Sequence, residues 1–432
     1  MANENPIDFT ISKLGECHFP SPIKNRHFIP EDDRLLYGGR LKDLQRALEA
    51  HQEPPAMELA GPREKIFFDP KELCCGIVTC GGLCPGLNDV VRAVVMGLHD
   101  EYGVKKVYGF RYGYEGLVKK FGHVPMELTP KGVSRIAEMG GTILGSSRGN
   151  QDAGEMVDML ESLKIGILFT LGGDGTLRGA HDISQEINRR GLKIAVIGIP
   201  KTIDNDISFV QKTFGLETAV SEARRFTYAA HSEATGARNG IGLVKLMGRD
   251  SGFIAAYTTL ADSQVNFCLV PEVPFTLSGF LQTLEKRLKE KAHAVIVVAE
   301  GAGQDLLKKE GGSKKDLSGN VLHDDIGVFL RNEIKAYFKK AGMEASVKYI
   351  DPSYTIRSMP AIAHDSAFCL LLGYAAVHAG MSGRTDMMVG SWKGEATHVP
   401  ITLATSKRKK IDLDGWLWEA VLASTGQPAD MA

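Results

Sequence analysis

The chain has 432 residues, with 51 lysine or arginine and 52 aspartate or glutamate residues, for a formal net charge of −1. This length allows two or three domains with a substantial core. The near-neutral charge provides no overall field for binding nucleic acid or an anionic membrane surface. Apolar residues make up 43% of the chain, as in an average globular protein, but 48 glycines exceed the usual share of about 7%. The glycine excess predicts many tight turns where the backbone approaches something closely.

The cysteine count and the apolar stretches bear on the cellular compartment. Seven cysteines, an odd number, do not suggest a disulfide framework in a chain of this length. The polar residues 1–5 lack the pattern of a secretory signal peptide. The longest apolar stretch, 367–381, is interrupted by Gly373 and His378 and falls short of the about 20 residues that a membrane span requires. These features predict a reduced, cytoplasmic protein with no membrane span.

In chain order, residues 1–70 are polar and proline-rich, and they predict an N-terminal extension without a core of its own, with a helical segment near 41–50. From about residue 73, β-rich runs end in glycine clusters and alternate with amphipathic segments, as in parallel βα units. The helical spacing of apolar residues from Leu87 to Leu98 predicts a helix packed on a sheet. Residues 303–326 predict a surface loop, and His364 and His378 are expected to pack in an apolar helix. The predicted strands cover residues 73–79, 165–171, 193–199 and 295–299.

Two glycine-rich turns have the residue types of a phosphate site. GGLCPG at 81–86 follows a predicted strand, and its glycines allow backbone N–H groups to reach a phosphate at a helix start. GGTILGSSR at 140–148 brings hydroxyl groups together with the guanidinium of Arg148. Each turn taken alone fits an ordinary connection or solvated loop equally well.

Two further turns carry acids. In GGDGT at 172–176, the carboxylate of Asp174 is placed after a strand, where it can hold Mg²⁺ while the backbone meets phosphate oxygens. In PKTIDND at 200–206, Asp204 and Asp206 would be costly neighbours unless a metal or cation shares them. This pattern favours catalysis over a plain N-cap and turn.

The absence of certain motifs excludes some classes of nucleotide-binding protein. The chain has no G-x-x-x-x-G-K-[ST] and no G-x-G-x-x-G, so it is neither a P-loop NTPase nor a carrier of the usual dinucleotide fingerprint. Cys74, Cys75, Cys80 and Cys84 contain no C-x₂-C pair, which argues against a zinc site. His231 receives no role. A kinase with an architecture other than the P-loop fold remains compatible with these motifs.

The motifs together resemble one family. GGLCPG, GGTILGSSR, GGDGT and PKTIDND are followed by MGR at 247–249, AEG at 299–301 and YTIR at 354–357, an order typical of phosphofructokinases. The resemblance covers about residues 71–405. It is strongest to the group of plant, protist and some bacterial 6-phosphofructokinases, whose members use ATP or pyrophosphate. PKTIDND with MGR is specific to the family, whereas diacylglycerol and NAD kinases also carry a turn similar to GGDGT.

The resemblance implies an α/β fold with two Rossmann-like domains, parallel-rich sheets and an active site in the cleft between them. The nucleotide domain would comprise 71–215 with 355–405, and the fructose 6-phosphate domain 216–354 with 406–432. The implied reaction transfers a phosphoryl group from ATP to the C1 hydroxyl of fructose 6-phosphate in glycolysis, in an allosteric homotetramer. The alternatives are pyrophosphate as donor, a catalytically silent sugar-phosphate-binding subunit, and another GGDGT-bearing kinase acting on a lipid or NAD.

The resemblance also assigns residues. Asp204 matches the general base, for which an ordinary pKa near 4 suffices because the proton leaves late in the transfer, and Arg249 and Thr202 complete the catalytic set. Asp174 and Asp206 would hold Mg²⁺, and Arg148 would neutralise charge on the γ-phosphate. The donor-binding residues are Gly82, Arg148, Gly149, Gly173, Asp174, Gly175 and Thr176. The sugar-phosphate residues are Thr202, Ile203, Asp204, Met247, Gly248, Arg249, Glu300, Lys348, Tyr354 and Arg357.

Some positions depart from the familiar bacterial pattern or conflict with one another. Lys348 stands where that pattern has an arginine from a neighbouring subunit, and Arg238 is an ambiguous match to a second such arginine. Gly175 leaves open the space of the ATP α-phosphate, which an aspartate would block in pyrophosphate users. Lys201 is shared with pyrophosphate users. An aspartate at position 175 would exclude ATP, whereas a lysine at position 201 is compatible with either donor. The absence of the aspartate therefore weighs more, and the predicted donor is ATP.

Overall fold

The computed structural model describes residues 7–24, 26–307 and 324–431. The chain divides into two compact units. Unit 1 contains the described residues of Met1–Thr202, Ile207–Phe214 and Pro360–Lys407, and unit 2 those of Ile203–Asp206, Gly215–Met359 and Arg408–Ala432. The chain therefore changes unit several times, including once within PKTIDND, after Thr202. The assignment of a nucleotide domain and a fructose 6-phosphate domain, with the boundaries given above, stays a prediction.

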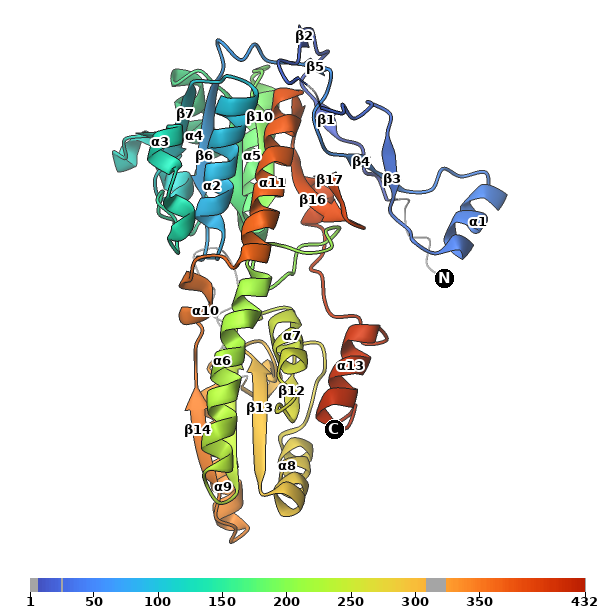
Figure 1. Cartoon of the computed structure of the whole chain (residues 1–432), viewed down its shortest axis with the longest axis vertical. Helices are drawn as coiled ribbons and strands as arrows, with labels where there is room; N and C mark the ends of the chain where they lie inside the picture. The colour runs from blue at the N-terminus through green and yellow to red at the C-terminus, as the bar shows by residue number, and fades with distance from the viewer. Residues whose placement is uncertain (1–6, 25, 308–323, 432) are drawn as a thin grey trace. The chain divides into compact units, whose positions relative to one another are not determined.

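Unit 1 is built on a nine-stranded sheet (Figure 1). Its five central strands are parallel and its outer strands antiparallel. The predicted strands at 73–79, 165–171 and 193–199 are confirmed, and they are buried along nearly their whole length, as expected of parallel strands covered on both faces. The order is β3 (Arg34–Leu36), β4 (Ala56–Leu59), β17 (Glu395–Pro400), β16 (Met387–Trp392), β10 (Ala195–Pro200), β9 (Ile165–Gly172), β6 (Cys74–Thr79), β7 (Lys106–Phe110) and β8 (Met126–Glu127).

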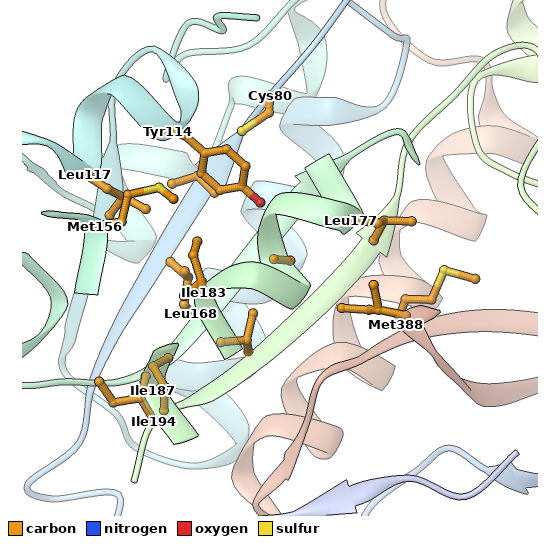
Figure 2. Packing of buried hydrophobic residues seen from close by; sticks show 14 of the residues in the cluster. Cys80, Tyr114, Leu117, Met156, Leu168, Leu177, Ile183, Ile187, Ile194 and Met388 are labelled. Atoms are coloured by element: carbon orange, nitrogen blue, oxygen red, sulfur yellow. The ribbon is translucent and has the colours of Figure 1, made fainter. Parts of the chain in front are cut away.

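Helices cover both faces of this sheet. A Cβ at Gly380 of α11 (Ala363–Met381) would lie 3.5 Å from Ile197, whereas a Cβ at the next strand residue, Gly198, would meet Leu177 of α5 (Asp174–Arg189). Successive strand residues point to opposite faces, so α11 and α5 lie on opposite faces. The predicted helix from Leu87 is confirmed as α2 (Leu87–Met96), and it packs beside α11 (Figure 1). Side chains of α5, β9 and β16 meet in the core that Figure 2 shows, with Leu168, Ile183 and Met388 among them.

Shorter elements complete unit 1. They are α4 (Ala153–Ser162), which packs on α5, α3 (Pro130–Val133), α12 (Ile401–Ala404), a π-helical turn (Gly97–Glu101) and 3₁₀ turns (Gly113–Leu117, Lys119–Phe121, Ile136–Glu138). His378 lies in α11 and shares a 2.8 Å hydrogen bond with the hydroxyl of Tyr102. His364, at the start of α11, is exposed, so the prediction that it packs in the helix is wrong. No helix in the described part of the chain is long and apolar enough to cross a membrane.

The N-terminal segment is part of unit 1, and the prediction that 1–70 have no core is wrong for much of the segment. β4 lies in the sheet between β17 and the edge strand β3, and Met57 within it is fully buried. Other strands of the segment are β1 (Ser12–Lys13), paired with β15 (Arg384–Thr385), and β2 (Phe19–Pro20), paired with β5 (Lys65–Ile66). The predicted helix is confirmed as α1 (Leu41–Glu49), which buries no residue. Edge pairing uses main-chain hydrogen bonds, which leave no mark in side-chain composition.

Unit 2 has a four-stranded parallel sheet in the order β12 (Phe267–Leu269), β13 (His293–Ala299), β11 (Gly240–Leu246) and β14 (Ser346–Ile350). The strand predicted at 295–299 is confirmed and begins two residues earlier. Of the loop predicted at 303–326, residues 308–323 lie outside the described residues; Gln304–Leu307 form a 3₁₀ turn and Ile326 begins a helix. The helices are α6 (Leu216–Thr235), α7 (Phe253–Ala261), α8 (Leu277–Lys291), α9 (Ile326–Lys340), α10 (Thr355–Ser358) and α13 (Trp416–Thr425). Both units are thus α/β, as the sequence predicts.

Candidate active site

The GGLCPG turn joins β6 to the start of α2. Gly81 and Gly86 have φ of +83° and +100°, in the region that favours glycine. A Cβ on Gly86 would also come within 2.5 Å of Cys369 Sγ and 3.0 Å of Phe214. Glycine is therefore required at position 86 by both backbone conformation and packing.

The second glycine-rich turn lies against the first. The Gly81 amide donates to the Ser147 carbonyl at 2.9 Å, and the Ser146 hydroxyl donates to the Gly81 carbonyl at 2.6 Å. The Thr79 hydroxyl at the end of β6 donates to the Gly145 carbonyl at 2.7 Å. These bonds hold the two turns together at the carboxyl end of β6. Arg148 is exposed at the end of the second turn, next to Gly149, which has φ of +107°.

GGDGT connects β9 to α5. A Cβ on Gly172 would collide with the Thr176 side chain, whereas a Cβ on Gly175 would meet nothing within 4 Å. Asp174 is the first residue of α5, and its carboxylate lies 3.0 Å from the guanidinium of Arg178, one turn later. Neither packing among the described residues nor backbone conformation thus explains the glycine at position 175.

Lys201 connects three of the motifs. It is the first residue after β10, its side chain is buried, and its ammonium donates to the Gly82 carbonyl at 2.7 Å. Its amide donates to the Gly172 carbonyl at 2.9 Å. The residues predicted to bind the donor therefore come together in unit 1, at the carboxyl ends of β6, β9 and β10.

The acidic part of PKTIDND lies in unit 2, where Asp204 is enclosed. Its carbonyl accepts a 2.9 Å bond from the Ser251 hydroxyl, and the Arg249 amide bonds its carboxylate. Burial raises the pKa of Asp204 well above its usual range, the carboxylates of Asp206 and Glu300 raise it further, and Arg249 opposes the shift. The expectation of an ordinary pKa near 4 is therefore wrong, because it left out burial and the carboxylate of Glu300, which is distant in sequence.

Asp206 and Asn205 contact the segment after α12. Asp206 Oδ2 lies 2.6 Å from the guanidinium of Arg408, and Asn205 Oδ1 accepts a 2.9 Å bond from the Lys409 ammonium. Burial lowers the pKa of Lys409 to about 7, although the Asp206 carboxylate opposes the shift. The sequence did not predict a role for either cation, because both belong to the basic segment 407–410, and four consecutive basic residues are typical of a solvated surface.

Four of the predicted sugar-phosphate residues, Met247, Gly248, Arg249 and Glu300, lie at the carboxyl ends of strands of unit 2. Gly248 follows β11 with φ of +126°, and a Cβ there would come within 2.6 Å of the Ser251 carbonyl. The Gly301 amide, after β13, donates to the Gly248 carbonyl at 3.0 Å. Burial raises the pKa of Glu300, and the cations Arg249, Lys245 and Arg357 oppose the shift. Met247, Gly248 and Arg249 thus follow β11, Glu300 follows the adjacent strand β13, and Arg357 is near enough to act on the pKa of Glu300.

Other predicted residues are placed differently. Lys348 lies on β14, 3.6 Å from Glu233, with nearly half of its side chain exposed, and Tyr354 is 75% exposed. The Arg357 guanidinium lies 4.8 Å from the centre of the Tyr354 ring, and its buried Nε has no hydrogen-bond partner among the described residues. Arg238 is exposed and 3.9 Å from Glu344.

Lys245 is a further residue that the sequence analysis missed. Its ammonium lies between Asp325 at 2.9 Å and Asp351 at 2.8 Å. Burial lowers its pKa, but hydrogen bonds to these two acids outweigh burial and raise it overall. A single charge on an otherwise apolar strand was the only available signal.

The predicted metal ligands belong to different units, Asp174 to unit 1 and Asp206 to unit 2. In the described residues, no three His, Cys, Asp or Glu side chains are grouped to hold a metal ion by themselves. Thr202 belongs to unit 1, where its carbonyl accepts a 2.6 Å bond from Thr213, and Ile203 is buried in unit 2. The catalytic and metal-binding roles stay predictions.

Glycine-marked turns at the carboxyl ends of parallel strands place the protein among the doubly wound α/β proteins that bind ligands at such ends. The family model for phosphofructokinase matches residues 74–380, and the chain belongs to the phosphofructokinase family.

Three relatives illustrate the match. The chain is 47% identical to an ATP-dependent 6-phosphofructokinase of Borreliella burgdorferi, over 99% of this chain and 98% of that protein. It is 48% identical to an ATP-dependent 6-phosphofructokinase of Amycolatopsis methanolica, over 98% and 95%. A solved structure of a pyrophosphate-dependent phosphofructokinase from Marinobacter aquaeolei matches with a TM-score of 0.67 and 21% identity, over 82% of this chain and 91% of that one. At that identity the solved structure supports the fold alone.

Proposed function

We propose that this chain is an ATP-dependent 6-phosphofructokinase, which transfers the γ-phosphoryl group of ATP to the C1 hydroxyl of fructose 6-phosphate. The identity of nearly half over nearly the whole length to proteins named for this activity supports the proposal. The product is fructose 1,6-bisphosphate, and the reaction belongs to glycolysis.

The observation that favours ATP over pyrophosphate is the space at Gly175. A side chain there would meet no atom of the described protein, so the protein itself does not require glycine. A ligand that extends past this position does require it, and ATP extends beyond the two phosphates that pyrophosphate has. Gly175 is therefore the residue that we assign to donor selection.

A pocket beside this turn suits the nucleoside of ATP. Its volume is about 450 Å³, within the usual range for small-molecule sites. Nδ1 of His181 lies 2.9 Å from both carboxylate oxygens of Asp386. With Nδ1 protonated, Nε2 is an acceptor that suits the amino group of adenine. The pocket is lined by Asn150, Arg178, His181, Asp182, Thr402, Thr405 and Ser406.

Mg²⁺ is proposed to bind with the donor, and Asp174 fits the role of protein ligand. Its carboxylate supplies the oxygen donors that Mg²⁺ prefers, and Mg²⁺ on phosphates needs only one or two carboxylates from the protein. Its present partner, Arg178, has a largely exposed side chain, so their ion pair costs little to break. Bound Mg²⁺ would neutralise charge on the transferring phosphates.

The other residues act by binding, neutralising and accepting a proton. Asp204 accepts the proton of the C1 hydroxyl, and its raised pKa makes it a stronger base than an ordinary carboxylate. Arg148 and Lys201 supply positive charge to the donor phosphates. Arg249 and Arg357 are suited to the 6-phosphate because a guanidinium binds phosphate through two parallel N–H groups.

The proposal extends to a cytoplasmic, allosteric homotetramer in which Lys348 reaches the sugar-phosphate pocket of a neighbouring subunit. The exposure of Lys348 supports this role, since nearly half of its side chain is accessible and its ammonium lies 3.6 Å from Glu233. A lysine supplies charge but not the fork of an arginine.

A coupled assay with fructose 6-phosphate and each donor in turn, at one enzyme concentration, tests the proposal. We expect turnover with ATP and Mg²⁺ and a much lower catalytic efficiency with pyrophosphate. Higher efficiency with pyrophosphate would reverse the donor, and no turnover with either would favour a silent sugar-phosphate-binding subunit.

A further inference from the structure

Two cations from the C-terminal part of the chain contact the loop that carries Asp204. The Arg408 guanidinium lies 2.6 Å from Asp206 Oδ2, and the Lys409 ammonium donates to Asn205 Oδ1 at 2.9 Å. The Lys409 amide also donates to the Asp206 carbonyl at 2.9 Å. Two adjacent residues thus make three bonds to two adjacent residues that are about 200 positions earlier in the chain.

The loop needs such support. Asn205 is buried and has φ of +53°, in the left-handed region that side chains rarely occupy without local stabilisation. Its side-chain oxygen is the acceptor of the Lys409 bond, so this bond holds the strained residue directly. Asp204 is the preceding residue, and any shift of Asn205 moves its carboxylate.

The surroundings of both cations are not those of a solvated basic run. The Lys409 ammonium lies 5.3 Å from the centre of the Phe253 ring, at the start of α7. The side chain of Asp206 is only 10% exposed where it meets Arg408. A buried charge loses its hydration, which is costly unless the charge is paired. The contacts of these two cations therefore replace hydration by water. Lys410, the next residue, is exposed and serves as a natural comparison.

We propose that Arg408 and Lys409 are positioning residues that hold the Asp204 carboxylate in place for proton abstraction, and that Asp206 serves as the partner of Arg408 and not as a metal ligand. This inference rests on the proposed function. It assigns a role to the two central residues of the basic run at 407–410 and revises the metal-binding role predicted for Asp206.

The first test measures steady-state kinetics of Arg408→Met and Lys409→Met, with Lys410→Met as the matched control. We expect kcat to fall by about 10²-fold, the cost of a displaced catalytic group. KM for ATP and for fructose 6-phosphate should stay near wild type, and Lys410→Met should be fully active. Arg408→Lys, which restores a cation opposite Asp206, should recover part of kcat.

The second test uses Asp206→Asn, which keeps the side-chain shape, and the double variant Asp206→Asn with Arg408→Met. If the two residues act as a pair, the double variant is no slower than either single variant. The Mg²⁺ concentration for half-maximal rate should be unchanged in Asp206→Asn. An Asp206→Asn enzyme that needs much more Mg²⁺ would restore the metal role and overturn the inference.

Other results against the inference are full activity of both methionine variants, or a loss of kcat matched by Lys410→Met. Thermal unfolding separates a positioning effect from loss of the fold, because it shows whether each variant is still folded at the temperature of the assay. If a methionine variant does not fold, Arg408→Lys and Asp206→Asn still decide the question. Wild-type enzyme without phosphofructokinase activity would refute the proposed function, whereas active wild type with unaffected variants would refute only this inference.

Discussion

The ammonium of Lys201 donates a 2.7 Å hydrogen bond to the carbonyl of Gly82, which joins the turn after β10 to the turn after β6. The same residue bonds the Gly172 carbonyl through its amide. A buried cation is thereby held between two glycine turns, a suitable arrangement for binding a polyanion.

Lys201→Met should lower kcat with ATP by about 10²-fold, the typical cost of removing one donor that stabilises developing charge. It should not create activity with pyrophosphate. Lys193→Met is the control, because Lys193 also donates to a backbone carbonyl, that of Leu14, outside the motif cluster. Steady-state kinetics with both donors checks this, and a Lys201→Met enzyme with normal kcat would remove Lys201 from the donor site.

Gly175→Asp should depress ATP use selectively. The new Cβ meets no protein atom, so the fold should tolerate it, but the carboxylate would repel the α-phosphate. We expect the catalytic efficiency with ATP to fall by at least about tenfold, as for juxtaposed like charges, with little change in KM for fructose 6-phosphate.

Gly175→Ala is the matched control for that variant, since it adds the Cβ without the charge and should stay close to wild type. Equal losses in both variants would mean that bulk, and not charge, disfavours substitution. Unimpaired ATP use by Gly175→Asp would remove Gly175 from donor selection.

Asp204→Asn should lower kcat by roughly 10²–10⁴, the range for loss of a general base, with a smaller change in KM for fructose 6-phosphate. The amide keeps the shape of the side chain but does not accept the proton. The measurement is kcat at saturating substrates, with intact folding checked by circular dichroism. A variant that keeps more than about a tenth of normal kcat would exclude Asp204 as the base.

Mixed oligomers test the proposed sharing of sites between subunits. If Asp204→Asn and Lys348→Ala are each nearly inactive, unfolding them together and refolding should restore activity. With random mixing, about a quarter of the sites would be wild type, because each site draws one chain from each of two equal pools. If confirmed mixed oligomers show only the summed activity of the two variants, Lys348 serves its own chain's pocket or none.

Mild acid should destabilise unit 1. His398 is fully buried beside Glu58, Arg384 and Arg63, and burial, aided by the two arginines, lowers its pKa to about 4 although Glu58 opposes the shift. Burial likewise lowers the pKa of His378 to about 4. An unfolded histidine binds a proton near pH 6.5, so between about 6.5 and 4 the unfolded chain holds more protons and stability falls as pH falls.

Thermal unfolding measured across this pH range checks the prediction. His398→Gln should unfold at a lower temperature at neutral pH and show a flatter dependence on pH, because one of the two contributing groups is gone. An unfolding temperature that does not change between pH 6.5 and 4.5 in the wild type would contradict it.

Local patterns in the sequence were sufficient to predict several of the central strands, the glycine turns and the family of this protein. The apolar runs that became β6, β9, β10 and β13 are buried on both faces, which only continuous hydrophobic sequence permits. Glycines such as Gly81, Gly86 and Gly172 stand where positive φ or close packing disfavours a side chain. The order of those turns sufficed to indicate the family, since each motif is short and contiguous. The prediction that ATP is the donor rests on Gly175, and the absence of a side chain at that position can be seen in the sequence itself.

Other properties arise only from contacts between distant residues. The N-terminal strands join the sheet through main-chain hydrogen bonds, which do not depend on particular side chains. For this reason the sequence predicted an irregular extension where the structure has β4. The raised pKa of Asp204 depends on Glu300 and on burial, and the support of its loop depends on Arg408 and Lys409, all far away in sequence. Burial and charge coupling are properties of three-dimensional neighbourhoods, and for this reason the sequence was sufficient to propose Asp204 as the base but not to reveal its environment.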